Sequence, residues 1–234
     1  MHITFDMETI PSQDPEILAT ISEEIAPPGN ISKQETIDAW NRDKKPAEID
    51  KAWRKTSLDG LLGHVAVVSA AFNDEEPVAF YVPGTPSGKQ VAAGEANVLR
   101  DFFDWVRERT AGQRATFVGH NIVGFDLLFL WQRCIVLGVQ AHRSVPLNAK
   151  PYDERIFDTM RAFTAGDRTK YVSMDKLAKA CGLQGKTDGM DGSQVWDYVN
   201  AGRIEDVAAY CKDDVRVARA IHQRMQGVAA LAVA

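Results

Sequence analysis

Hydrophobic and polar residues alternate over the opening of the chain, HITFDMETIP, and this period of two predicts a strand that ends at the turn of Pro11. The segments 63–72 and 77–82 predict two further strands, joined by the charged turn 73–76. Strands that follow one another through a short turn favour an antiparallel meander.

Residues 12–62 interrupt this pattern between the first and second strands. The segment is rich in charge and in proline, and its apolar residues recur at helical spacing, as in Ile37 with Trp40 and Ile49 with Trp53. We therefore expect a helical insertion after the first strand.

Strands and helices alternate in the rest of the chain. Helices are predicted at 95–110, 125–138, 173–181 and 203–226, and short buried strands at 115–118 and 155–159. A meander followed by such alternation is typical of an α/β layered domain with a mixed sheet. A length of 234 residues, 45% of them hydrophobic, is enough for one such core, so we expect a single domain over 1–234.

Composition and charge argue against several classes of protein. Three scattered cysteines predict neither a disulfide framework nor a zinc site, and the chain shows no signal peptide or long apolar run, so a cytoplasmic protein without membrane contact is expected. A net charge of −5 argues against a protein that coats duplex DNA through many phosphate contacts. It leaves open a protein that binds the end of a strand.

Asp6 and Glu8 are two positions apart in the first predicted strand, so both side chains leave the same face of the sheet. Two carboxylates this close repel each other unless a proton or a cation neutralises them. Alone, the pair is more typical of solvated acids at a strand end. Together with other acids it indicates a divalent metal site.

Two further motifs carry such acids. Asn121 and Asp126 lie five apart before an apolar helix, where Asp126 alone would be a helix-capping acid. Tyr210 and Asp214 lie four apart in the last predicted helix and therefore share one face, whereas Asp213 points about 100° away.

In this order the three motifs resemble those of the DEDD, or DnaQ-like, superfamily of 3′–5′ exonucleases, which has a ribonuclease H-like fold. The chain is similar to the tyrosine subgroup, because the histidine subgroup would place histidine at the position of Ala209. It looks most like stand-alone exonucleases related to the proofreading domain of family B DNA polymerases. The likeness spans the chain apart from the insertion.

The resemblance implies a two-metal site of Mg²⁺ or Mn²⁺ held by Asp6, Glu8, Asp126 and Asp214. Asp6 would bridge both ions, Glu8 and Asp214 would complete the site of the attacking water, and Asp126 would hold the second ion. Tyr210 would orient the water, because a tyrosine with an ordinary pKa of about 10 stays protonated and is a poor base.

Five residues are candidates for substrate binding: Met7, Thr9, Asn121, Phe125 and Lys186. Single strands are usually bound by aromatic stacking and a few basic groups. Each candidate also has a structural interpretation, because an aromatic residue in an apolar helix normally packs inside, lysine often faces solvent, and asparagine is common in turns. The resemblance implies that Asp158 has a structural role and is not a catalytic acid.

Three other interpretations compete. Residues 180–187 fit a relaxed phosphate-loop pattern, but that mechanism requires a strand before the loop and a helix after it, and the sequence predicts neither. A phosphatase with an aspartyl nucleophile typically has Asp-x-Asp, whereas the second position here is Glu8. A catalytically silent nucleic-acid-binding module would be expected to have lost one of the four acids.

The sequence thus predicts a ribonuclease H-like α/β domain that releases 5′-mononucleotides from the 3′ end of single-stranded DNA. An RNA-trimming enzyme of the same chemistry is the alternative, because recognition of the ribose hydroxyl cannot be read from these residues. A separate polymerase or a replication or repair protein is the expected protein partner, with proofreading or DNA repair as the setting.

Overall fold

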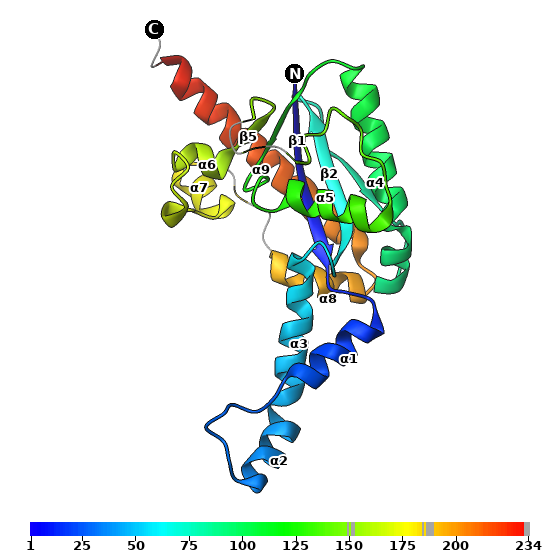
Figure 1. Cartoon of the computed structure of the whole chain (residues 1–234). Coiled ribbons are helices and arrows are strands. Elements are labelled where there is room, and N and C mark those ends of the chain that lie inside the picture. The colour runs from blue at the N-terminus through cyan, green and yellow to red at the C-terminus, as the bar shows by residue number, and fades with distance from the viewer. Residues whose placement is uncertain (149, 151–152, 184, 186–189, 232–234) are drawn as a thin grey trace.

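A computed structural model describes residues 1–148, 150, 153–183, 185 and 190–231 (Figure 1). Five strands form one mixed sheet in the order β3-β2-β1-β4-β5. They are β1 (His2–Ile10), β2 (His64–Phe72), β3 (Val78–Tyr81), β4 (Thr116–Gly119) and β5 (Ile156–Asp158). The first three strands run antiparallel as the expected meander, and β4 and β5 run parallel to β1. The predicted α/β class with a mixed sheet is confirmed.

Strand β1 is central to the sheet, but its two edges are paired over different lengths. Its pairing with β2 runs from Ile3 to Ile10, whereas its pairing with β4 stops at Thr4. Strand β4 ends at Gly119, where a Cβ atom would lie 2.2 Å from Cγ2 of Ile122 and 2.8 Å from the carbonyl oxygen of Phe5. This close approach requires glycine. The second half of β1 therefore has an edge that β4 does not cover.

Helices cover both faces of the sheet (Figure 1). They are α1 (Pro15–Glu24), α2 (Gln34–Asp43), α3 (Lys45–Lys55), α4 (Gly88–Thr110), α5 (Asp126–Leu137), α6 (Thr159–Phe163), α7 (Met174–Ala180), α8 (Val195–Asn200) and α9 (Ile204–Leu231), with 3₁₀ turns η1 (Thr56–Leu58), η2 (Arg168–Lys170) and η3 (Gly192–Gln194). Phe5 and Met7 of β1 pack with α4 and α5 in one core cluster. Ile10 packs with α8 and α9 in another. Side chains of β1 thus alternate between the two helical layers.

The predicted insertion 12–62 is an arm of three helices, α1 to α3, that projects from the body (Figure 1). None of these helices contains a fully buried residue. The two ends of the arm are tied together, because the N–H of Ser12 donates to Oγ1 of Thr56 and the indole of Trp53 donates to the carbonyl oxygen of Ser12. The arm is therefore anchored at its base.

A buried ion pair holds the layer of α4 and α5 to the base of the arm. Arg133 of α5 donates two hydrogen bonds to Glu95 of α4, each 2.8 Å long, and a third to the carbonyl oxygen of Gly60. Glu95 also accepts from the N–H of Val65 and contacts His64. Burial raises the pKa of Glu95, but the hydrogen bonds from His64 and Arg133 outweigh it and hold the pKa below its usual value.

Most predicted elements are present, with three differences. Helix α4 begins at Gly88, because Ser87 and Gln90 form a capping box seven residues before the predicted start. The short helices α6 and α8 were not predicted. Within the described residues, no helix combines the length and the apolar character that crossing a bilayer requires.

Candidate active site

Strand β1 presents Asp6 and Glu8 toward the layer of α8 and α9, since Phe5 and Met7 on either side of Asp6 point to the opposite core. Asp6 is half-buried and Glu8 is 9% exposed. A register shift follows Glu8, where β1 bulges against β2. Both carboxylates thus lie between the sheet and α9, as the alternation predicts.

Helix α9 brings Asp214 against these two acids. One carboxylate oxygen from each of Asp6, Glu8 and Asp214 lies within 4.8 Å of the others. One turn earlier, the thiol of Cys211 donates to the backbone oxygen of Asp6 at 3.4 Å and lies 3.6 Å from Oδ2 of the same residue. Burial, together with Asp6 and Glu8, raises the pKa of Cys211 well above its usual value. The thiol therefore stays protonated and donates.

Asp126, the first residue of α5, lies at the uncovered edge of β1. Its carboxylate accepts from the N–H of Met7, and it is only 3% exposed. Burial, with smaller contributions from the carboxylates of Asp158 and Asp214, raises the pKa of Asp126 to about 7. A carboxylate in this place is therefore unfavourable unless a positive charge is bound beside it.

Asp158 positions the loop that precedes α5. Its carboxylate accepts from the N–H groups of Asn121 and Val123 and from those of Met160 and Arg161 at the start of α6. An acid with four backbone donors orders two segments at once. This geometry agrees with the structural interpretation of Asp158.

Asn121 has a left-handed backbone with φ of 64°. Its carbonyl oxygen accepts from Gly124 and Phe125, so the residue forms the turn that leads into α5. The side chain of Asn121 lies against Gly124, where an added Cβ would be 2.4 Å from Oδ1. The asparagine thus has a local structural role here, whether or not it also contacts substrate.

Tyr210 lies one turn before Asp214 on α9 and is 7% exposed. Asp213, by contrast, pairs with Arg216 on the outer side of the helix. The predicted separation of these neighbouring acids onto different faces is therefore present in the structure.

The remaining predicted substrate residues are placed as follows. The side chain of Met7 is buried in the core beneath the sheet, and the ring of Phe125 packs against Phe129 with centroids 5.5 Å apart. The hydroxyl of Thr9 donates to the carbonyl oxygen of Ser57 at 2.7 Å. Lys186 lies outside the described residues.

The acidic cluster fits a divalent cation. Three carboxylates within 4.8 Å repel one another in a partly buried place, and an all-oxygen donor set suits Mg²⁺ or Mn²⁺. Asp126, whose pKa responds to Asp214, provides a fourth carboxylate for a second ion. In the part of the chain that the structure describes, no other group of three potential ligands lies this close together.

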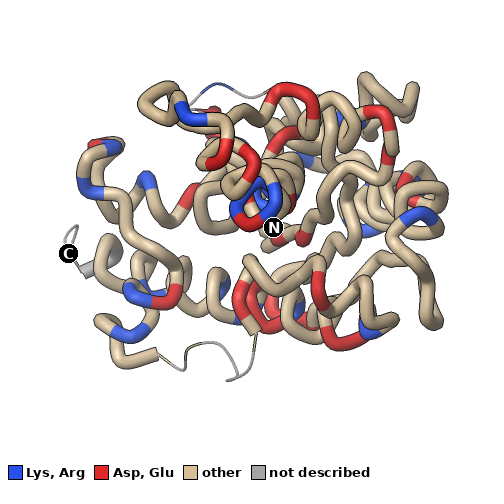
Figure 2. The backbone as a smooth tube through the Cα atoms, turned by 90° about the horizontal axis from the view of Figure 1, so that it is seen from below, with Lys and Arg blue, Asp and Glu red and all other residues tan. Residues whose placement is uncertain are grey.

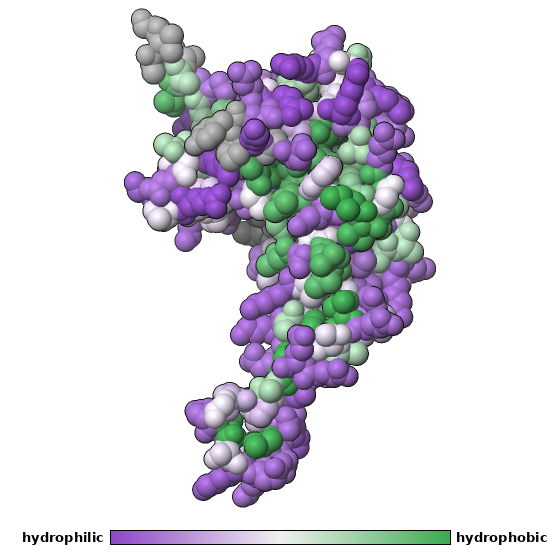
Figure 3. Space-filling view, in the orientation of Figure 1, coloured by the Kyte–Doolittle hydropathy of each residue, from purple (hydrophilic) through white to green (hydrophobic). Residues whose placement is uncertain are grey.

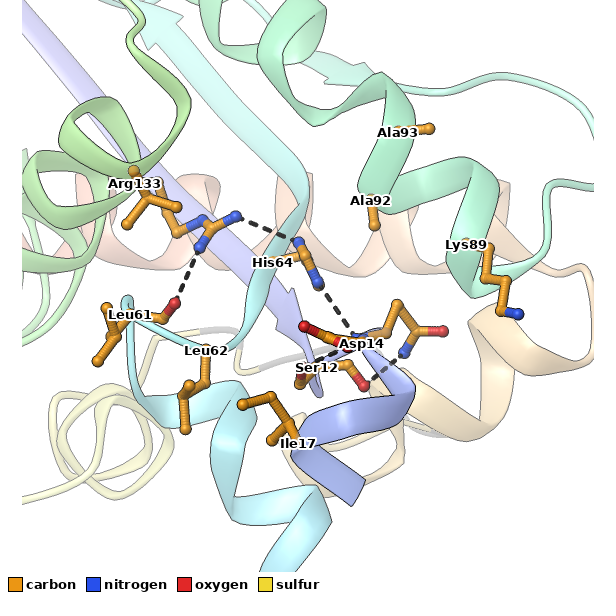
Figure 4. A pocket seen from close by; sticks show the side chains of 12 residues that line it. Ser12, Asp14, Ile17, Leu61, Leu62, His64, Lys89, Ala92, Ala93 and Arg133 are labelled. Atoms are coloured by element: carbon orange, nitrogen blue, oxygen red, sulfur yellow. Dashed lines mark hydrogen bonds between the residues drawn. The ribbon is translucent and has the colours of Figure 1, made fainter. Parts of the chain in front are cut away.

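Among the described residues, the basic ones do not gather on one face in the view of Figure 2. Lysine and arginine positions are interspersed with acidic ones in the view from below (Figure 2). A cavity of about 650 Å³ at the base of the arm is lined by His64, Lys89 and Arg133, among others, and by none of the four acids (Figure 4). The cavity and the acidic cluster are thus separate features of the described chain.

Sequence reasoning did not single out Cys211 as part of this site. No local signal distinguishes it from another apolar residue of α9, because its contact with Asp6 joins residues 205 positions apart. The arrangement as a whole defines an α/β protein with a carboxylate site at the uncovered edge of its central strand.

Comparisons with known proteins place this arrangement in a family. A family model described as a predicted 3′–5′ exonuclease related to the exonuclease domain of PolB matches residues 61–230. The chain belongs to this family. The matched region contains Asp126, Tyr210 and Asp214, and it begins after the segment with Asp6 and Glu8.

The fold is also similar to part of a known polymerase. The family B DNA polymerase of the hyperthermophilic archaeon Pyrobaculum calidifontis superposes with a TM-score of 0.57 at 19% sequence identity over 96% of this chain. The chain spans 24% of that polymerase. The expected ribonuclease H-like fold is therefore confirmed. A search of curated proteins found no match to the chain.

Proposed function

We propose that this protein is a metal-dependent exonuclease of the tyrosine subgroup that removes 5′-mononucleotides from the 3′ end of single-stranded DNA. The observation that carries the proposal is the meeting of Asp6, Glu8 and Asp214 within 4.8 Å, with Asp126 beside them. These acids come from three elements of a chain that belongs to a family of predicted 3′–5′ exonucleases.

The four acids provide places for two cations. Asp6, Glu8 and Asp214 would hold one ion, and Asp126 together with Asp6 would hold the second. When bound, such a pair lowers the pKa of an attacking water and stabilises charge on the entering and leaving oxygens. In the reaction, a bond forms from the water oxygen to phosphorus while the bond from phosphorus to the 3′ oxygen breaks. The attacking water gives up a proton to solvent, and the leaving 3′ oxygen takes one from solvent.

Neighbouring groups position these acids through hydrogen bonds. Cys211 donates to Asp6 from beneath, Met7 donates its N–H to Asp126, and Asp158 orders the turn before α5. Acids placed in advance need no reorganisation when the charge on phosphorus develops. Tyr210, adjacent to Asp214 on α9, would donate its hydroxyl hydrogen bond to orient the water.

The test compares end-labelled DNA and RNA strands of the same sequence, each with a free or a blocked 3′ end, in Mg²⁺ or Mn²⁺. We expect mononucleotides from the DNA strand with the free 3′ end, no product in EDTA, and no product from Asp6→Ala. Far-ultraviolet circular dichroism shows whether that variant keeps its fold. If folded Asp6→Ala digested DNA as fast as the parent, the proposal would be wrong. Faster digestion of RNA would favour the alternative substrate.

A further inference from the structure

Two cavities lie at the base of the arm and within it, and Lys55 lines both. The first, of about 330 Å³, begins at Thr9, the residue after Glu8, and includes Leu58 and Trp196 in its walls. The second, of about 480 Å³, lies within the arm between α3, α2 and the loop after α1. Because Lys55 is the last residue of α3, the two cavities follow one another along this helix. We call the second cavity the arm groove.

The arm groove combines an aromatic surface with positive charge. Trp40 is half-buried in its wall beside Ile25 and Pro28, and Lys51 and Lys55 are exposed at its rim. The two lysines are four residues apart and lie about 6 Å apart along one face of α3. Neighbouring phosphates and bases of a single strand require such alternating basic and aromatic contacts.

The lysines of the groove are available for an anion. Neither Lys51 nor Lys55 forms an ion pair with a described residue, whereas Arg54 between them pairs with Asp50 and Asp197. Helix α3 carries four basic and two acidic residues, while α1 carries three acids and no base. Positive charge in the arm is therefore concentrated on α3, the helix that ends at the base of the arm.

Most of the side chains on the lower part of the arm are hydrophilic (Figure 3). A small group of hydrophobic side chains shows among hydrophilic ones near the end of the arm (Figure 3). Hydrophobic and hydrophilic side chains both line the groove, and the acids Glu24 and Glu48 are among the hydrophilic ones. An apolar wall with exposed charges at its rim suits a base with its phosphates better than a second apolar protein surface.

We propose that the arm groove binds single-stranded DNA upstream of its 3′ end, with phosphates at Lys51 and Lys55 and a base stacked on Trp40. This inference rests on the proposed function, which places the 3′ end at the acids. Helix α3 has 11 residues and is about 16 Å long. At about 3.4 Å per nucleotide, a strand needs about five nucleotides to pass along it. A trinucleotide should therefore occupy the acidic cluster without reaching Trp40.

The first experiment measures binding without catalysis. Fluorescence anisotropy in EDTA follows 5′-fluorescein-labelled oligothymidylate of 15 nucleotides with the parent and with the double variant Lys51→Gln/Lys55→Gln. We expect Kd to rise at least tenfold. The slope of log Kd against log salt should decrease by about 1.4, because each phosphate contact on a single strand contributes about 0.7.

Trp40 is tested by a matched pair of variants. Trp40→Ala should weaken binding of the 15-mer about tenfold, as expected for the loss of one stacked base. Trp40→Phe keeps an aromatic face and should stay within twofold of the parent. Lys89→Gln, which removes an exposed lysine outside the groove, should leave both Kd and the salt slope unchanged.

A second substrate separates this inference from the proposed function. All variants should hydrolyse a thymidine trinucleotide in Mn²⁺ at the parental rate, because they leave the four acids intact. If the parent does not hydrolyse the trinucleotide, the proposed function fails, and binding of the 15-mer still decides the role of the arm. If the double lysine variant binds the 15-mer with parental affinity and parental salt slope, the inference is wrong.

Discussion

Asp213 and Asp214 are adjacent in the sequence, but only Asp214 faces the other acids. Asp214 is 4% exposed and belongs to the cluster with Asp6 and Glu8, whereas Asp213 pairs with Arg216 on the outer side of α9. The two residues therefore provide a matched test in one helical turn.

Asp214→Asn should reduce the rate of nucleotide release at least a hundredfold, since it removes charge where the proposed ion binds. Asp213→Asn should keep the rate of nucleotide release within about twofold of the parent, because a partly exposed ion pair outside the cluster contributes little. Initial rates in Mn²⁺, with circular dichroism as a check on folding, measure both. Equal losses in the two variants would contradict the assignment of Asp214.

At this scale the spacing of residues predicts which of them share a face, and the joint pattern of the motifs predicts the site. Asp6 with Glu8 follows from the period of a strand, and Tyr210 with Asp214 from the period of a helix. The contact of Cys211 with Asp6 and the position of Asp126 against Met7 depend on how α9 and α5 pack on β1. Spacing along the chain carries no such information.

Among the elements, the turn before α5 depends on Asp158. Asp158→Ala removes the acceptor of four backbone N–H groups, so we expect the free energy of unfolding to fall by about 2 to 4 kcal/mol. Asp167→Ala is the control, because Asp167 caps only the exposed turn η2, and its loss should cost much less than the loss of Asp158. Urea unfolding followed by fluorescence compares the two. If Asp158→Ala lowered the free energy of unfolding no more than Asp167→Ala does, the loop would be ordered by other contacts.

The ion pair between α4 and α5 predicts how stability depends on pH. The pKa of Glu95 is lowered in the folded protein, so the stability it contributes is present above its unfolded pKa and is lost as pH falls through the folded value. Glu95→Gln should cost about 3 to 5 kcal/mol at pH 7, because it leaves Arg133 buried without a charge partner. Thermal unfolding from pH 7 to pH 3 should show the difference shrinking below about pH 4.5. A difference independent of pH would exclude the charge of Glu95 as the cause.

The predicted elements and the observed ones differ where tertiary packing decides. Strands β1 to β5 have clear hydrophobic patterns, and all five were expected. Helices α6 and α8 have only five and six residues, which is too short for a helical period to be read from the sequence. The start of α4 depends on the capping box of Ser87 and Gln90 in a segment with few apolar residues. The prediction therefore began at the first strongly apolar turns.

For the whole molecule, the crowded carboxylates should make stability depend on divalent cations. Mg²⁺ at a hundred times its Kd adds about 2.7 kcal/mol, which for a chain of this size raises Tm by about 5 to 10 °C over that in EDTA. Asp214→Asn should remove most of this rise, and NaCl at equal ionic strength should not reproduce it. Differential scanning fluorimetry measures all three. An identical rise in Asp214→Asn would place the stabilising ion elsewhere.

The tie between Ser12 and Thr56 brings both ends of the arm to one point beside the second half of β1. Whatever lies between those ends can change in length or composition without altering the spacing of Asp6 and Glu8, because the strand before it and the strand after it are already joined by their own ladder. The fold thus holds the acids on the sheet and the arm outside it, so that the two can vary separately. A segment that can be exchanged at this junction could change what the arm contacts while the positions of the four acids stay the same.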